Sequence, residues 1–113
     1  MNTSLNRRAF MMSVDPDKKQ ECLDYVSKVS SDLTNQMKKN GIHQYSLFLD
    51  QDSCLLFGFL EYRSERGLET FTSSEECKQW WKETSQFIIS NEDNSPISTD
   101  LQEVFRLTNV QPK

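Results

Sequence analysis

Apolar and polar residues alternate along the chain with two different periods, and the period changes where one element ends. Residues 8–14, RAFMMSV, carry apolar side chains on both parities, which predicts a first strand. Between Asp15, a suitable N-cap, and Gly41 the apolar residues recur at helical spacing, which predicts one long helix with a buried stripe. The stripe consists of Cys22, Val26, Val29, Leu33 and Met37.

The middle of the chain predicts a β-hairpin. Apolar runs over residues 43–50 and 54–62 are separated by the turn-forming residues 51–53. A short helix is expected over residues 64–71. The hairpin would supply the second and third strands of a sheet.

A second amphipathic helix carries the only two tryptophans. Ser73, with Glu76 three residues later, predicts a capping box at its start, and its apolar stripe continues to Ile88. A polar loop over residues 91–98 follows. LQEVFRL, residues 101–107, alternates apolar and polar positions and predicts the last strand.

The order strand, helix, two strands, helix, strand predicts an α+β fold. It is the ferredoxin-like split βαβ arrangement, with helices on one face of a four-stranded antiparallel sheet. The strands nevertheless carry apolar residues on both parities, as Phe57 and Phe59 against Leu56 and Leu60 show. A second copy packed sheet to sheet would cover the other face, because two-fold dimers are the commonest oligomers. We therefore expect a homodimer.

Length and composition narrow the class of protein. The 113 residues predict a polar tail over residues 1–6, one domain over residues 7–108 and a C-terminal tail over residues 109–113. A net charge of −4 without a Lys/Arg cluster disfavours nucleic-acid binding. No apolar run matches a signal peptide or a membrane span, and the three cysteines are widely spaced, so we expect reduced thiols and a cytoplasmic location.

Groups for catalysis are few. Three glycines form no clustered phosphate-binding loop, and one histidine excludes multi-histidine metal sites, so we expect no cofactor and no metal. His43 is the only side chain that titrates near neutral pH without a special environment. It shares strand parity with Tyr45, so both are candidates to face one cavity. The alternative is a polar residue at a strand entrance.

Trp80 and Trp81 form the second group of candidates. Neighbouring helical residues point about 100° apart, so the two rings cannot both lie on one narrow stripe. Polar and charged residues such as Lys78 and Gln79 flank them. Sugars stack their C–H faces on indole rings and need such polar partners for their hydroxyls. Plain core packing of at least one ring is the alternative.

Three segments together resemble a known family. They are RAFMMSVDPDKKQE, GIHQYSLFLDQDSCLLFGFLEY and CKQWWKETSQFIISNEDNSPISTDLQEVFRL. In order and spacing they resemble the L-rhamnose mutarotase family over residues 7–108, without gaps. The resemblance implies a dimeric α/β barrel of ferredoxin-like protomers. It also implies an isomerase of carbohydrate metabolism that interconverts the α and β anomers of L-rhamnose or a similar deoxy sugar, with no cofactor.

The resemblance also carries site residues onto this chain. The family's sugar-binding residues fall on Tyr45, Trp80 and Trp81. On the first helix the chain departs from the family, because Cys22 and Val26 occupy the positions of a tyrosine and the catalytic histidine. Ser30-Ser31 stands in place of a Trp-Pro pair. Valine cannot transfer a proton, so the family's usual acid is missing.

Three hypotheses remain open at this stage. The protein is a mutarotase in which His43, Tyr45 or Cys22 replaces the missing acid, although Cys22 would need a lowered pKa. Alternatively, it binds a sugar without catalysis. In the third hypothesis the pocket is filled by core packing, and the protein is a structural or interaction dimer. We take anomer interconversion as the leading prediction and a catalytically impaired sugar-binding or structural dimer as its alternative.

Overall fold

The computed structural model describes residues 5–108, so the expected C-terminal tail and most of the N-terminal tail lie outside the described residues. The first half of the chain forms β1 (Asn6–Ser13), the 3₁₀ turn η1 (Pro16–Lys18), α1 (Lys19–Val26) and α2 (Ser31–Lys39). The hairpin consists of β2 (Ile42–Asp50) and β3 (Leu55–Tyr62). The last elements are α3 (Glu65–Thr72), α4 (Glu75–Thr84) and β4 (Ser98–Leu101).

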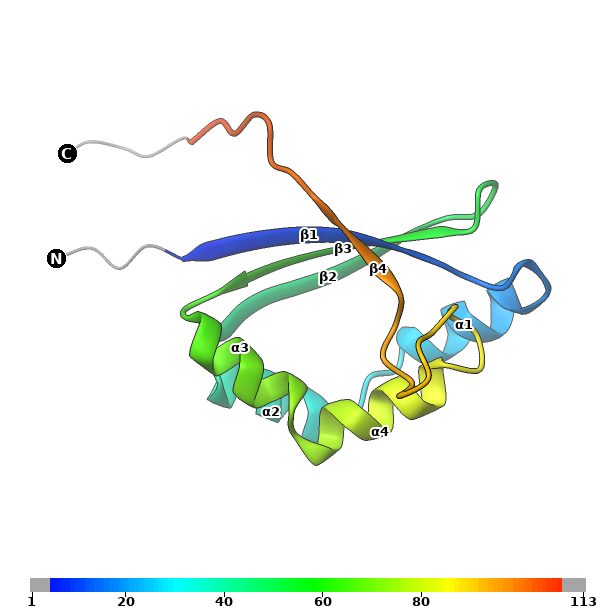
Figure 1. Cartoon of the computed structure of the whole chain (residues 1–113), viewed down its shortest axis with the longest axis horizontal. Coiled ribbons are helices and arrows are strands. Elements are labelled where there is room, and N and C mark those ends of the chain that lie inside the picture. Colours follow the sequence, from blue (N-terminus) through cyan, green and yellow to red (C-terminus); the bar gives the residue numbers. More distant parts are fainter. Residues whose placement is uncertain (1–4, 109–113) are drawn as a thin grey trace, which may run out of the picture.

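The four strands form one antiparallel sheet in the order β2-β3-β1-β4. Figure 1 shows the helices together on one face of this sheet, with the other face uncovered. The predicted ferredoxin-like α+β fold is therefore confirmed. In the described part of the chain, no helix is long and apolar enough to cross a membrane.

The single long helix expected between Asp15 and Gly41 is wrong, because the chain leaves the helix after Val26 and starts a new one at Ser31. Ser30 is the N-cap of α2, and its hydroxyl accepts a hydrogen bond from the Leu33 amide at 3.2 Å. Serine competes well for this position, so a local cap interrupts a hydrophobic stripe that is otherwise continuous.

Two boundaries in the C-terminal half also differ from the prediction. Ser74, not Ser73, caps α4, and its hydroxyl accepts a hydrogen bond from the Cys77 amide at 3.1 Å. The expected strand over residues 101–107 is wrong as well. β4 covers Ser98–Leu101, and residues 102–108 belong to no strand because no neighbouring strand of this chain pairs with them.

The core consists of two clusters of buried side chains between the sheet and the helices. One lies under α2, α3 and α4 and includes Leu33, Met37, Leu60, Phe71 and Trp80. The other lies under α1 and the end of α4 and consists of Met12, Val14, Cys22, Leu56 and Ile88. Phe10 and Leu47 pack against both clusters. A cavity borders the first cluster.

The outer face of the sheet is apolar, as the two parities of the strands predict. Burial alternates strictly along β3, with Leu56 and Leu60 buried toward the helices and Phe57 and Phe59 partly exposed on the other side. Phe48 of β2 pairs with Phe57 and is 62% exposed. We call this surface the open face; its other apolar members are Ala9, Met11 and Leu55.

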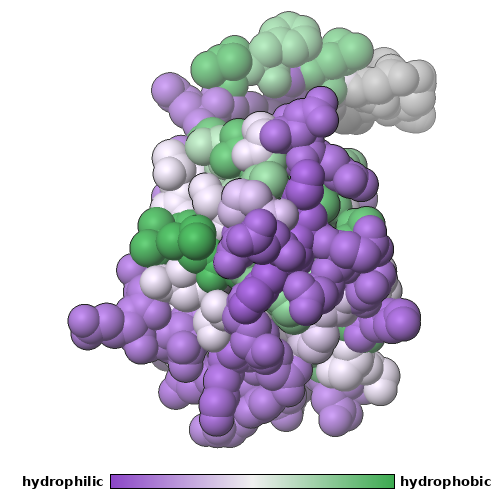
Figure 2. All heavy atoms as spheres, turned by 90° about the vertical axis from the view of Figure 1, so that its right-hand side faces the viewer, coloured by the Kyte–Doolittle hydropathy of each residue, from purple (hydrophilic) through white to green (hydrophobic). Residues whose placement is uncertain are grey.

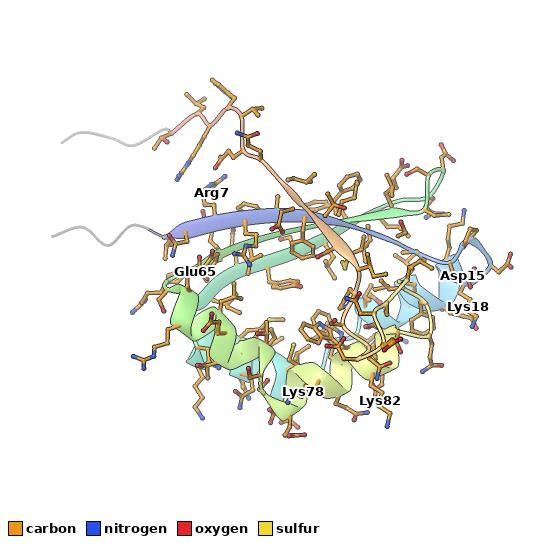
Figure 3. All side chains as sticks on the ribbon, viewed as in Figure 1. Arg7, Asp15, Lys18, Glu65, Lys78 and Lys82 are labelled. Atoms are coloured by element: carbon orange, nitrogen blue, oxygen red, sulfur yellow. The ribbon has the colours of Figure 1, made fainter. Side chains whose placement is uncertain are left out.

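Charged residues border the open face at one end. Arg7 projects from β1 away from the helices, as Figure 3 shows. Its guanidinium bonds Glu61 of β3 at 2.7 Å and Glu103 at 3.3 Å, and it lies over the Phe59 ring at 4.9 Å. Lys78 and Lys82 point outward from α4 on the opposite side of the molecule. Arg7 therefore ties the segment after β4 to the edge of the open face.

Candidate functional site

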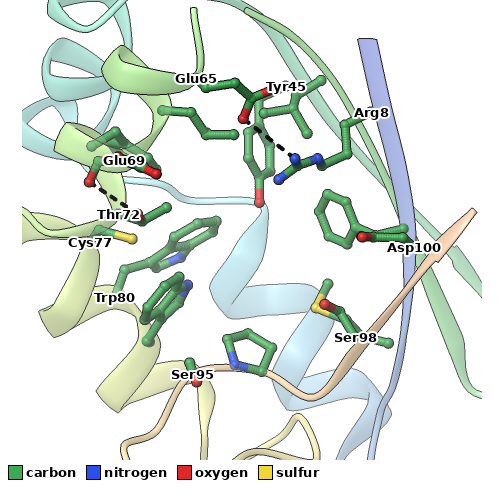
Figure 4. A pocket seen from close by; sticks show the side chains of 17 residues that line it. Arg8, Tyr45, Glu65, Glu69, Thr72, Cys77, Trp80, Ser95, Ser98 and Asp100 are labelled. Carbon is green, nitrogen blue, oxygen red and sulfur yellow. Dashed lines mark hydrogen bonds and ion pairs between the residues drawn. The ribbon is translucent and has the colours of Figure 1, made fainter. Parts of the chain in front are cut away.

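A cavity of about 400 Å³ lies between the sheet and helices α3 and α4. It is lined by side chains from β1, β2, α3, α4 and the segment leading into β4, which Figure 4 shows from close by. Tyr45, Trp80 and Trp81 all line it. The three residues carried over as sugar-binding are thus brought together in one place. The volume is in the range of small-molecule sites.

Aromatic rings form one wall of the cavity. Tyr45 meets Trp80 edge to face, with ring centroids 6.0 Å apart, and meets Phe10 in the same way at 6.3 Å. The Phe10 ring lies directly over Gly58, where a Cβ would come within 2.2 Å of it. Any larger residue at position 58 would push Phe10 toward the cavity, so this glycine sets the position of one lining ring.

The wall presents two unused hydrogen-bonding groups. Trp80 is 9% exposed, and its indole Nε1 is the one buried side-chain polar atom among residues 5–108 that lacks a hydrogen-bond partner. The Tyr45 hydroxyl also has no partner among those residues, and Figure 4 shows it pointing into the cavity. A buried donor without a partner costs stability, and a ligand that accepts a hydrogen bond from it would recover that cost.

Burial keeps two of the lining groups neutral. Desolvation, with a smaller contribution from Cys77, raises the pKa of Tyr45 well above its ordinary value. Desolvation also raises the pKa of the Cys77 thiol to about 12. Neither group releases its proton at ordinary pH, so Tyr45 acts as a hydrogen-bond donor and not as a base.

A charged cluster lies at the other end of the cavity, and sequence reasoning missed it. Arg8 lies 3.6 Å from the Glu65 carboxylate, which also accepts a 2.5 Å hydrogen bond from the Tyr62 hydroxyl. Asp100 of β4 lines the same end. Arg8 shares strand parity with Phe10 and Met12, so an inward-facing charge was readable from the alternation. Asp100 was hidden because the last strand was expected to begin one residue later.

The loop that precedes β4 forms a further wall of the cavity. The Asp93 carboxylate accepts hydrogen bonds from the Ser95 hydroxyl at 2.5 Å and from the Ser95 amide at 3.0 Å. These two bonds, the hydroxyl first, lower the pKa of Asp93. Asn94 follows with φ of 74°, a left-handed conformation that asparagine tolerates well. The loop thereby presents Ser95 and Pro96 to the cavity.

The first helix contributes no titratable group to the cavity. Val26 lines a small apolar recess of about 20 Å³ that shares Tyr45, Trp80 and Trp81 with the main cavity. Cys22 is 1% exposed and lines neither space, and burial raises the pKa of its thiol. The lowered thiol pKa that a catalytic Cys22 requires is therefore opposite to what its surroundings produce.

His43 does not face the cavity, so the expectation that it shares one with Tyr45 is wrong. The β2–β3 register shifts between Ile42 and Gln44, which places a β-bulge at His43. Ile42 is buried and Tyr45 faces the helices, whereas His43 is exposed and lines no cavity described above. One extra residue in a strand reverses the facing of those before it, and the bare sequence did not reveal this bulge.

The described residues that could ligate a metal are spread over the structure. Among positions 5–108, no three side chains of His, Cys, Asp or Glu lie where they could hold one ion. Cys22, Cys54 and Cys77 are all free thiols. The cavity instead combines stacking rings, unpaired donors and a charged end, which is typical of a site for a small ligand with several hydroxyls.

The fold and cavity thus define a small ferredoxin-like protein with a polar-ligand site between its sheet and helices. The chain belongs to the L-rhamnose mutarotase family, whose profile matches residues 7–107. It is 42% identical over 101 residues to an L-rhamnose mutarotase of Pectobacterium carotovorum, covering 89% of this chain and 97% of that protein. An L-rhamnose mutarotase of Klebsiella pneumoniae is 40% identical with the same coverage.

Solved structures agree with this assignment. The crystal structure of an L-rhamnose mutarotase from Formosa agariphila superposes with a TM-score of 0.80 at 30% identity, covering 91% of this chain and 99% of that one. A putative antibiotic biosynthesis monooxygenase from Nitrosomonas europaea superposes with a TM-score of 0.65 at 8% identity, covering 89% of each chain. The second likeness concerns the fold alone.

Proposed function

We propose that this protein interconverts the α and β anomers of L-rhamnose. The observation that carries the proposal is the convergence of Tyr45, Trp80 and Trp81 on one cavity that holds unpaired hydrogen-bond donors. A pyranose offers apolar C–H faces for the indoles and oxygens for the Trp80 N–H and the Tyr45 O–H. Membership of the mutarotase family supports the same substrate class.

The reaction requires proton transfers at two oxygens and the breaking of one C–O bond. The anomeric hydroxyl loses a proton, the ring oxygen gains one, and the C–O bond between the anomeric carbon and the ring oxygen breaks to give the open aldehyde. Rotation about the next C–C bond and closure on the other face give the second anomer. Positioned acid–base groups typically contribute about 10²–10⁴-fold to such a step. No cofactor takes part.

A second candidate is a sugar-binding protein without catalysis. The specific observation in its favour is Val26, which stands where the resemblance places the family's catalytic histidine and which lines only an apolar recess. In the described part of the chain, no histidine lines the cavity. The two candidates share the binding site and differ only in whether anomers exchange faster on the protein.

We further propose that two copies pair through the open face. Phe48, Phe57 and Phe59 lie on it, and a contiguous apolar surface of this kind is typical of an interface. Beyond β4 the chain carries three more exposed apolar residues, at 86%, 81% and 80% exposure: Val104, Phe105 and Leu107. Figure 2 shows this segment as a hydrophobic projection above a largely hydrophilic body.

The segment after β4 therefore has the character of a strand that lacks a partner in its own chain. It carries apolar residues at alternate positions, as Phe105 and Leu107 show, and a free sheet edge of a second copy would satisfy its backbone. A cytoplasmic location stays a prediction, and it fits the three free thiols, because disulfides persist mainly in oxidising compartments.

Two measurements on one sample test the proposed function. Titration with L-rhamnose, and with L-fucose as a second deoxy sugar, is expected to change the tryptophan fluorescence, because both indoles line the cavity. NMR exchange between the two anomers of L-rhamnose is expected to be faster with protein than in buffer. If the sugar binds but its anomers exchange no faster than in buffer, the second candidate holds, a sugar-binding protein without catalysis. An unchanged fluorescence with either sugar would exclude both ligand functions.

A further inference from the structure

We propose that Asp100 is the proton acceptor for the anomeric hydroxyl, in place of the group that this chain lacks on its first helix. The inference rests on the proposed function, because it concerns the same cavity and the same reaction. It assigns the proton-transfer step to β4, which lies across the cavity from the aromatic wall formed by Trp80 and Trp81. The step therefore does not need the helix that carries Val26.

The strand register aims Asp100 at the cavity. Asp100 pairs with Phe10 of β1, and both residues line the cavity from the sheet. Ser98, two residues earlier on β4, lines it too, as alternation along a strand requires. Figure 4 shows Asp100 opposite Trp80, with the Tyr45 hydroxyl between them in the view. A ligand that stacks on the indoles therefore has its other side toward β4.

Three carboxylates line the cavity, and their contacts distinguish them. Glu65 is occupied, because it accepts the Tyr62 hydroxyl at 2.5 Å and lies 3.6 Å from Arg8. Glu69, like Asp100, makes no side-chain hydrogen bond or ion pair with a described residue, but it lies on α3, on the same side of the cavity as the indole wall, and is distinguished by this position. Asp100 makes no side-chain hydrogen bond or ion pair with any described residue, so its oxygens are available to a ligand. It is the free carboxylate on the sheet side.

The other groups in the cavity serve as donors. Tyr45 and Cys77 keep their protons because burial disfavours their charged forms. Trp80 is nine-tenths buried, and its unpaired Nε1 can only donate. Arg8 supplies positive charge at the same end as Asp100. The cavity thus offers donors from both layers, with Tyr45 on the sheet and Trp80 on α4, and a free acceptor at Asp100 of β4. A hemiacetal that opens needs both kinds of group.

The proton balance closes with Asp100 and water. The Asp100 carboxylate takes the proton of the anomeric hydroxyl as the C–O bond to the ring oxygen breaks and an aldehyde forms. A water molecule gives a proton to the ring oxygen and takes the proton of Asp100 in exchange, so carboxylate and water are both restored once the aldehyde has formed. After the aldehyde has turned, the ring hydroxyl attacks the carbonyl carbon and passes its proton through water to Asp100. Asp100 then gives that proton to the former carbonyl oxygen, and carboxylate and water are restored again.

The test compares Asp100→Asn with the unmodified protein and with Asp52→Asn. Asp52 lies in the exposed turn between β2 and β3, so its variant makes the same change of charge away from the cavity. Anomer exchange is measured by NMR, and L-rhamnose binding by fluorescence. We expect Asp100→Asn to reduce catalysed exchange by about 10²-fold or more. Affinity should change by less than about tenfold, since at most one hydrogen bond is altered.

Asp100→Glu separates chemistry from structure. It keeps the carboxylate and should therefore retain measurably more exchange than Asp100→Asn. If Asp100 had a purely structural role, exchange should be lost in both variants. Normal exchange by Asp100→Asn, with normal exchange by Asp52→Asn, would overturn the inference and leave the proposed function intact. Buffer-rate exchange by the unmodified protein would overturn both. Circular dichroism melts of all variants show whether any loss reflects unfolding.

Discussion

Tyr45 of β2 and Trp80 of α4 meet edge to face inside the cavity, with ring centroids 6.0 Å apart and planes inclined by 67°. The contact joins the sheet to the helix layer at the site. The tyrosine hydroxyl stays free, since it has no hydrogen-bond partner among residues 5–108 and points into the cavity. The same pair therefore holds the fold together and presents a donor to the ligand.

The first prediction concerns that hydroxyl. Tyr45→Phe keeps the ring contact with Trp80 but removes the donor, so stability should stay within about 0.5 kcal/mol. Affinity for L-rhamnose should fall by about 0.5–1.5 kcal/mol, measured by calorimetry. Tyr25→Phe is the matched control, because the Tyr25 hydroxyl donates to Glu83 and neither residue lines the cavity. Equal affinities for the two variants would contradict the assigned role of Tyr45.

The second prediction separates the two tryptophans. Trp80 is buried in the core cluster, so Trp80→Ala should cost about 3–5 kcal/mol of stability. Trp81 is only partly buried beside that cluster, so Trp81→Ala should cost clearly less. It should still weaken L-rhamnose binding by about tenfold through loss of a stacking surface. A Trp81→Ala variant with unchanged affinity would mean that the ring serves packing alone.

The third prediction concerns stability at alkaline pH. Burial raises the pKa of Cys77 from 9.0 to about 12 and also raises that of Tyr45, so the folded state holds these protons more tightly than the unfolded state. The free energy of unfolding should therefore fall as pH rises above about 9 toward 12. Denaturant titrations across this window measure the slope.

Cys77→Ala tests the origin of that slope. It should lower stability at pH 7 by about 1 kcal/mol, because a small buried group is lost. Above pH 9 its stability should fall less steeply than that of the unmodified protein, because one of the tightly held protons is gone. Parallel pH curves for the two proteins would show that the Cys77 thiol is not responsible.

The fourth prediction concerns the open face. Phe48→Lys places a charge on the apolar surface that Phe48 and Phe57 form, so it should convert the proposed dimer to a monomer. Sedimentation velocity at micromolar concentration measures this. Ile89→Lys is the control, since Ile89 is 49% exposed and lies after α4, outside the sheet. If the unmodified protein sediments as a monomer, the proposed interface is contradicted.

Much of the fold was readable from local patterns. Strands and helices follow from periodicity, and the apolar residues on both parities correctly indicated an uncovered sheet face. The break at Ser30 was not expected, because the hydrophobic stripe runs on across it while a local cap stops the helix. The end of β4 depends on the absence of a neighbouring strand, which is a property of the assembled sheet and not of LQEVFRL itself.

The site could also be predicted only in part, because some of its residues come together only in the assembled sheet. Tyr45, Trp80 and Trp81 were candidates from their positions and surroundings, the family resemblance named them as sugar-binding, and all three line one cavity. Arg8 and Asp100 lie far apart in sequence and line the same end of the cavity only because β1 pairs with β4. His43 was misplaced because a bulge changes the facing of one residue, and no turn residue marks that bulge in the sequence.

Anomer exchange of L-rhamnose on the purified protein tests the central claim most directly. Saturation-transfer NMR on the two anomeric protons gives the exchange rate in buffer, with the unmodified protein and with Trp81→Ala. We predict that the exchange rate rises in proportion to the concentration of the unmodified protein. At the same low sugar concentration, Trp81→Ala should raise it less. An exchange rate equal to that of buffer at every protein concentration would contradict the central claim.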